Sequence, residues 1–100
     1  MNINKNPLEG VPVDFFNLGD SGSKVLALID WSLSRDNSDL IILDSKTLNS
    51  WNAIFYSKKI SRASLKSGII RLKNANIISI PVTKNVYFVN PRFVKGDSNE

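Results

Sequence analysis

The chain has 100 residues, of which 42% are hydrophobic, and this is enough apolar material for one small domain with a single core. It contains no cysteine and no histidine, which excludes disulfides, thiolate metal sites and the Ser-His-Asp and Cys-His nucleophile systems. The formal net charge is only +4, but this value conceals a strong asymmetry between the two halves of the chain.

The acidic and basic residues are separated along the sequence. The first 45 residues carry seven acids against Lys5, Lys24 and Arg35, which leaves a formal charge of −4. Residues 46–96 carry no acid and ten basic residues, which gives +10. The basic residues of this segment are Lys46, Lys58, Lys59, Arg62, Lys66, Arg71, Lys73, Lys84, Arg92 and Lys95. Such an asymmetry indicates a polyanionic partner, most often nucleic acid, because each neutralised phosphate releases counterions.

The N-terminal part of the chain predicts an arm, an apolar cluster and one helix. Residues 1–10 are polar and lack a period, so we expect a flexible arm. The apolar cluster at 11–18 could form a dimer interface or pack on the core. Asp20 and Ser21 are candidate N-caps of a first helix that should end within 35–38. The apolar face of this helix consists of Val25, Leu28, Ile29 and Leu33.

The middle of the chain predicts a short strand and two helices. Residues 40–43 form an apolar run that is typical of a buried strand, and Asp44 or Ser45 then caps a second helix. The apolar face of the second helix consists of Leu48, Trp51, Ile54 and Phe55. Residues 57–60 break this pattern, and Ser61 caps a third helix that residues 74–76 end. Its apolar face consists of Leu65, Ile69 and Leu72.

Two further features of the helices bear on packing. Gly68 costs roughly 1 kcal/mol relative to alanine inside a helix, which indicates a close approach by the preceding helix. Trp31 and Trp51 lie within helical stretches, so we interpret them as core or interface residues rather than base-stacking residues.

After the third helix the apolar period changes to that of strands. Residues 77–82 and 86–89 are rich in β-branched side chains and flank a polar tip at 83–85, which predicts a β-hairpin. The element order is therefore helix, strand, helix, helix, hairpin. We predict an α+β winged helix-turn-helix, with three helices, a small antiparallel sheet and a β-hairpin wing. It should occupy residues 11–94, followed by a C-terminal tail at 95–100.

The third helix presents the residues that indicate function. In a helix-turn-helix the second of two adjoining helices lies in the major groove and presents its N-terminal side chains to base edges. Arginine pairs with guanine, serine pairs with several bases, and alanine contacts the thymine methyl group. We expect base contacts in the first two turns, phosphate contacts beside them and a wing contact at the hairpin tip. The predicted DNA-binding residues are Lys58, Lys59, Ser61, Arg62, Ala63, Ser64, Lys66, Ser67, Arg71, Lys73 and Lys84.

Two segments resemble known proteins. Residues 60–65 and 72–78 look like the turn, recognition helix and strand entry of bacterial winged-helix proteins. The run Val86-Tyr87-Phe88-Val89-Asn90-Pro91, followed by Phe93-Val94-Lys95-Gly96-Asp97, resembles the firmicute plasmid replication family. This resemblance implies a DNA-binding protein that acts in replication initiation or copy control of a plasmid or mobile element.

The sequence therefore predicts sequence-specific binding of double-stranded DNA through a recognition helix at about 61–74. Two alternatives remain open, a small winged-helix transcriptional regulator and a winged-helix protein-interaction module without DNA binding. A single-strand or RNA binder would need stacking aromatics, for which Tyr87 and Phe93 are the candidates. We expect a cytoplasmic protein without enzymatic activity, cofactor or membrane association. A homodimer and replication or transcription protein partners are open.

The sequence offers one candidate for a metal site. Asp36, Asp39 and Asp44 cluster around a predicted loop, but their spacing of three and five residues matches no calcium loop. We therefore expect turn and cap roles for these carboxylates and no metal.

Overall fold

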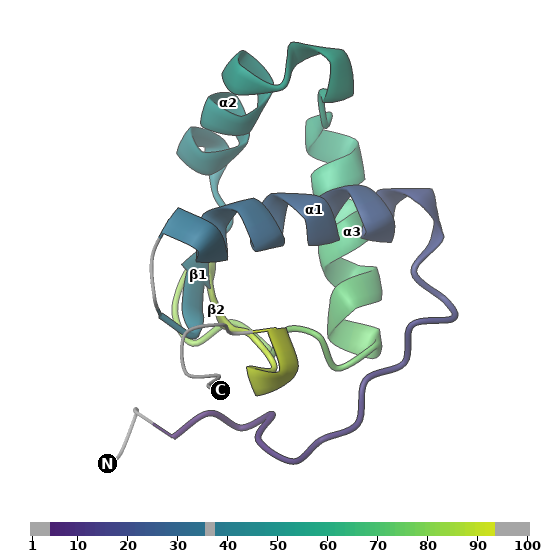
Figure 1. Ribbon diagram of the computed structural model, residues 1–100, viewed down its shortest axis with the longest axis vertical. Helices are drawn as coiled ribbons and strands as arrows, with labels where there is room; N and C mark the ends of the chain where they lie inside the picture. Colours follow the sequence, from purple (N-terminus) through teal and green to yellow (C-terminus); the bar gives the residue numbers. More distant parts are fainter. Residues whose placement is uncertain (1–4, 36–37, 94–100) are drawn as a thin grey trace.

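The computed structural model describes residues 5–35 and 38–93 and contains three α-helices and a two-stranded antiparallel sheet in that part of the chain. The helices are α1 (Gly19–Arg35), α2 (Ser45–Ile54) and α3 (Arg62–Asn74), and the strands are β1 (Leu40–Ile42) and β2 (Val86–Phe88). Short 3₁₀ turns, η1 (Tyr56–Lys58) and η2 (Pro91–Phe93), follow α2 and β2. In Figure 1, α1 crosses α3, and η1 lies in the turn that joins α2 to α3. The α+β class is confirmed. The predicted tail at 95–100 and the motif residues Val94 to Asp97 lie outside the described residues.

The boundaries of α2 and α3 follow the predicted signals closely, whereas α1 begins at Gly19, so the predicted N-caps Asp20 and Ser21 lie inside its first turn. Asp44 caps α2 by accepting a hydrogen bond from the Thr47 N–H, and Ser61 caps α3 by accepting one from the Ser64 N–H. The α3 helix ends in a left-handed residue, Asn76, with φ of 63°. The Asn76 N–H donates to the Lys73 carbonyl and the Ile77 N–H to the Leu72 carbonyl, which is the Schellman arrangement.

The predicted hairpin is only partly present. β2 pairs with β1, with Ile41 opposite Tyr87, rather than with a strand at 77–82. Residues 77–82 contain no regular strand. Isolated bridges at Ile78–Val89 and Thr83–Val86 join residues 78–83 to β2 and to the residue that follows it. Pro81 has no N–H to donate, and the Ser79 hydroxyl donates to the neighbouring Ile80 carbonyl while it accepts from the Phe88 N–H. Three backbone bonds remain between the two segments, from Ser79 N–H to the Phe88 carbonyl, from Val82 N–H to the Val86 carbonyl and from Asn90 N–H to the Ile77 carbonyl, so the hairpin is present but irregular.

The tip of the predicted hairpin is a tight turn. The Val86 N–H donates to the Thr83 carbonyl over 3.1 Å. Asn85 has φ of 64°, a left-handed conformation that asparagine tolerates better than most residues. The turn at 83–85 is therefore confirmed, and it places Lys84 at an exposed position.

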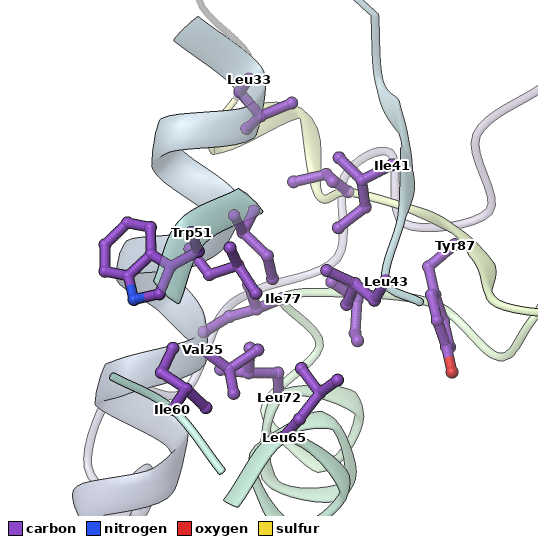
Figure 2. Close-up of a cluster of buried hydrophobic side chains, with 14 of the residues drawn as sticks. Val25, Leu33, Ile41, Leu43, Trp51, Ile60, Leu65, Leu72, Ile77 and Tyr87 are labelled. Atoms are coloured by element: carbon purple, nitrogen blue, oxygen red, sulfur yellow. The ribbon is translucent and has the colours of Figure 1, made fainter. Parts of the chain in front are cut away.

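One core joins the three helices to the inner face of the sheet (Figure 2). Val25 of α1, Trp51 of α2 and Leu65 and Leu72 of α3 converge with Ile41 and Tyr87 of the sheet. Trp51 is buried, as predicted, and Trp31 is half-buried with its ring centroid 5.8 Å from that of Trp51. Ile54 was predicted on the core face of α2, but its side chain is 57% exposed because the helix ends there and the chain turns into η1.

The close approach inferred from Gly68 is real, but α1 makes it rather than α2. A Cβ atom built on Gly68 would lie 2.5 Å from the Ser21 carbonyl oxygen and would also clash with the Val25 side chain. No other residue type fits at this crossing without movement of one helix.

Residues 5–18 pack more closely than predicted. The expected flexible arm includes Asn6 and Leu8, yet both side chains are buried. The Asn6 amide donates to the Asp39 carboxylate and the Val89 carbonyl, which holds the segment on the sheet. Of the cluster at 11–18, Leu18 belongs to the core and Val13 packs against it. The core-packing alternative therefore holds for these two residues, whereas Phe16 is 94% exposed.

None of the helices in the described part of the chain is long and apolar enough to cross a membrane.

Candidate nucleic-acid interface

The outward side of α3 begins immediately after its cap. Arg62, Ala63 and Lys66 are exposed, whereas Leu65, Gly68 and Leu72 are buried against the rest of the domain. The Ser61 hydroxyl oxygen accepts the cap bond from the Ser64 N–H, so the main contribution of Ser61 is to start the helix at this point. The predicted separation into a core face and an outward face is therefore confirmed for these residues.

A groove runs between α3, the start of α2 and the sheet. Its volume is about 390 Å³. Arg62 and Lys66 line it from α3, and Asn85, the residue after Lys84, lines it from the turn. Its floor is apolar and its lining includes Leu43, Leu48, Leu65, Ile69, Ile70 and Tyr87. The groove therefore brings two predicted base-reading residues of α3 next to the turn that carries Lys84.

The charged groups of this groove are available for a ligand. Neither Arg62 nor Lys66 makes an ion pair with another residue of the described chain. Arg62 has one long hydrogen bond, 3.5 Å from its guanidinium to the Ser45 hydroxyl. Burial raises the pKa of Tyr87 above its usual value, so at neutral pH this phenol is uncharged and can still donate a hydrogen bond.

Within residues 5–35 and 38–93, Asp44 is the one acid that lines the groove. Its carboxylate accepts hydrogen bonds from the N–H and the hydroxyl of Thr47. The backbone bond from Thr47 is the largest cause that lowers the pKa of Asp44. The carboxylate is thus engaged by the first turn of α2, where the helix dipole also favours a negative charge. Of the other acids considered for a metal, Asp39 accepts from Asn6, and Asp36 lies outside the described residues.

The opposite side of α3 is turned towards α1. Ser67 is exposed, as predicted, but its hydroxyl lies 3.1 Å from that of Ser21 in α1, because Gly68 lets the two helices approach. The Arg71 guanidinium donates to the Asn17 carbonyl. Ser64 and Lys73 are half-buried. These four predicted DNA-binding residues do not line the groove that holds Arg62 and Lys66.

Lys58 and Lys59 lie in a third place. Both are exposed in the turn between α2 and α3, and both line a separate groove together with Lys24 of α1. The structure therefore places Arg62 and Lys66 in the groove beside α3, Arg71 on the α1 side of α3, Lys58 and Lys59 in the turn between α2 and α3, and Lys84 in the 83–85 turn.

Of the lining residues, only Arg62 and Lys66 were predicted to bind DNA; Ile70, Ser45 and Asn85 are among those that the prediction did not assign to the site. Ile70 is 55% exposed on α3 although the pattern there is apolar. Ser45 and Asn85 contribute from outside α3. The helical period of α3 could have indicated Ile70, because it falls off the face set by Leu65, Ile69 and Leu72. The position of Ser45 and Asn85 depends on tertiary packing and has no sequence signal of its own.

Comparisons of the chain with family models, with curated proteins and with solved structures found no match.

Proposed function

We propose that this protein binds double-stranded DNA in a sequence-specific manner, with α3 as the recognition helix in the major groove. The observation that carries the proposal is the groove in which Arg62 and Lys66 of α3 meet Asn85 of the 83–85 turn. In this proposal α2, the η1 turn and α3 form a helix-turn-helix, and the 83–85 turn with β2 forms a short wing. Two cations that form no ion pair within the described part of the chain, beside a turn that carries Lys84, suit the edges and phosphates of a duplex.

The same surface favours a duplex over a single strand. Single-strand binding depends on aromatic rings that bases can stack on. Tyr87 is buried and Phe93 is half-buried, and the more exposed Phe16 and Tyr56 do not line the α3 groove. Arg62 and Lys66 are exposed basic residues on one helix, and the aromatic residue that lines the groove beside them, Tyr87, is buried. This arrangement fits a duplex better than a single strand.

We further propose a role in the replication of a plasmid or mobile element, with transcriptional regulation as the alternative. This part rests on the resemblance of residues 86–97 to plasmid replication proteins. The structure gives Asn90 of that segment a packing role, because its amide bonds the Val11 and Asn76 carbonyls. The resemblance therefore supports the architecture more directly than it supports a replication activity.

The experiment that tests DNA recognition is a selection of bound sequences from random duplex DNA at near-physiological salt. We expect wild-type protein to enrich a short motif and Arg62→Ala to enrich a motif degenerate at one or more positions. Arg92→Ala is the matched control, because Arg92 is an exposed arginine in η2 and outside the groove. Failure of the wild type to enrich any motif, in the presence of a folded protein, would contradict the proposal.

A further inference from the structure

A second groove lies on the other side of the α2–α3 turn. It has a volume of about 410 Å³ and is formed by α1 and the turn that contains η1. Ser23, Lys24 and Ala27 line it from α1, and Ser57, Lys58, Lys59 and Ile60 line it from the turn. Trp51 closes it from α2. It shares no lining residue with the groove beside α3.

The groove combines an apolar floor with a basic rim. Ala27, Trp51 and Ile60 are its apolar lining residues, and Lys24, Lys58 and Lys59 are its charged ones. None of the described residues that line it is acidic. Lys24 forms an exposed i,i+4 ion pair with Asp20 over 3.3 Å, and exposed pairs of this kind are weak enough to exchange for another carboxylate.

The turn that forms one wall is held firmly in place. The Trp51 indole N–H donates to the Lys58 carbonyl over 2.9 Å. The Asn52 amide donates to the Ile60 carbonyl and accepts from the Ile60 N–H, over 3.0 and 2.8 Å. These three side-chain bonds fix the backbone on both sides of Lys59. A ligand would therefore meet a preformed groove and would not have to order the turn.

We propose that this groove docks an acidic segment of a protein partner that carries a large apolar side chain. The apolar side chain would contact mainly Ala27, which is exposed, because Trp51 and Ile60 at the floor are only 6% and 2% exposed. The flanking carboxylates would pair with the three lysines of the rim. The charge of the rim and the apolar floor complement such a segment together, whereas neither feature alone would select it.

The same features argue against nucleic acid as the occupant. Phosphates gain nothing from an apolar floor, so the apolar lining of this groove favours a peptide side chain over a nucleic-acid backbone. Because the two grooves share no residue, the protein could hold DNA on α3 and a protein partner on the turn at the same time. This docking site does not depend on the proposed DNA binding.

The test is a titration of the full chain with a capped peptide of sequence EDLFEE, followed by tryptophan fluorescence and calorimetry. The chain has two tryptophans, so Trp31→Phe leaves Trp51, which closes the groove, as the only indole reporter. We expect saturable binding with a change in Trp51 emission. The charge-matched peptide EDSSEE should bind at least about tenfold more weakly, because it lacks the apolar anchor.

Two variants locate the binding. Lys59→Glu reverses a rim charge at an exposed position and should weaken EDLFEE binding by roughly tenfold or more. Lys46→Glu makes the same change at an exposed position outside the groove and should leave a clearly smaller loss. Equal affinity for the two peptides would reduce the effect to general attraction between charges and overturn the proposal. Equal losses of EDLFEE affinity in Lys59→Glu and Lys46→Glu would also overturn the proposal. Displacement of the peptide by a generic duplex at equimolar concentration would overturn it as well.

Discussion

At the scale of single residues, the most constrained position is the crossing of α1 and α3. Gly68 costs helix propensity, so Gly68→Ala would stabilise an isolated helix by about 1 kcal/mol. In this protein the added Cβ would meet the Ser21 carbonyl oxygen at 2.5 Å and the Val25 side chain. We expect Gly68→Ala to lower the free energy of unfolding by about 1–3 kcal/mol, as overpacking does. Urea denaturation measures it.

The control for this prediction is Ser50→Ala, at an exposed position of α2. This substitution also improves helix propensity and should be neutral or slightly stabilising. If the Gly68→Ala protein were at least as stable as the wild type, α1 and α3 could move apart without loss of folding free energy. This result would contradict the conclusion that the close crossing requires glycine.

A second residue whose substitution should destabilise the fold is Asn90, which is 1% exposed. Its amide nitrogen donates to the carbonyls of Val11 and Asn76, and its oxygen accepts from the Arg92 N–H. It thus ties the N-terminal segment, the end of α3 and η2 together. Asn90→Asp keeps the shape but removes both donors and buries a charge. We expect a loss of at least about 2 kcal/mol in unfolding free energy.

Thermal and urea unfolding of Asn90→Asp beside Asn49→Asp, an exposed asparagine of α2, separates this effect from the added charge. Equal stabilities of the two variants would remove the tying role of Asn90. The sequence placed Asn90 in a motif but could not reveal this role, because its partners Val11 and Asn76 are 79 and 14 residues away.

At the scale of elements, the caps of α2 and α3 and the 83–85 turn could be predicted, whereas the strand at 77–82 could not. Ser61 and the end of α3 at 74–76 depend on local bonds, and a local pattern is enough to find them. Residues 77–82 form no regular strand, because Pro81 has no N–H and the Ser79 hydroxyl accepts from the Phe88 N–H, so only scattered backbone bonds join this segment to residues 86–90. The other edge of β2 pairs with β1, more than 40 residues earlier. Pairing over such a distance is not encoded in the alternation of either segment.

The cap of α2 gives a pH-dependent prediction. The pKa of Asp44 is lowered from 3.8 in the folded protein, chiefly by the backbone bond from Thr47. The charged cap therefore stabilises the fold fully above that value, and this contribution is lost as the pH falls through the lowered pKa. Asp44→Asn keeps a capping acceptor without the charge. We expect it to be less stable than wild type at pH 7 by about 0.3–1 kcal/mol.

The difference between Asp44→Asn and wild type should disappear as the pH falls below 3.8. Melting temperatures from pH 7 down to the acid limit of reversible unfolding measure this convergence. If the difference in melting temperature between the two proteins stayed constant from pH 7 to the acid limit, the loss of stability in Asp44→Asn would come from packing. This result would contradict a role of the carboxylate charge.

The two sides of the proposed DNA surface should respond differently to truncation. Arg62 lies in the first turn of α3, where base edges are read, whereas Lys84 lies at the tip of the 83–85 turn. We expect Arg62→Ala to lose about 1–3 kcal/mol of binding free energy on the selected duplex and much less on a scrambled one. Lys84→Ala should weaken both duplexes alike and reduce the salt slope by about one unit.

Affinities on the two duplexes across a salt series test this pair, with thermal unfolding as the check that both variants are folded. Equal losses on the two duplexes for Arg62→Ala would remove it from base reading and leave it a phosphate contact.

At the scale of the whole molecule, the order of helices and the first strand could be predicted because each is built from a local apolar period. The surfaces could be predicted only in part. The charge along the sequence indicated one basic face. Folding instead distributes the basic residues over the α3 groove, the α1 side of α3 and the turn between α2 and α3. Helix crossings decide this distribution, and the crossing at Gly68 was visible in the sequence only as an unfavourable residue.

The N-terminal segment illustrates the same limit. Asn6 and Leu8 lie in a polar stretch that indicates a flexible arm, yet both are buried, and the Asn6 amide donates to the Val89 carbonyl. A polar residue that is buried by a hydrogen bond to a distant carbonyl leaves no periodic signal. The prediction of an arm from composition therefore failed for the part of it that the structure describes.

The central claim is that α3 and the 83–85 turn form one DNA-binding surface. The most direct measurement is a titration of isotope-labelled protein with the selected duplex, followed by backbone amide NMR. We predict that the largest shifts fall on the exposed residues of α3 near Arg62 and Lys66 and on residues 83–85, while Lys24 and Ala27 of α1 stay unchanged. Shifts confined to the groove between α1 and the turn, or no shifts at saturating duplex, would contradict the account.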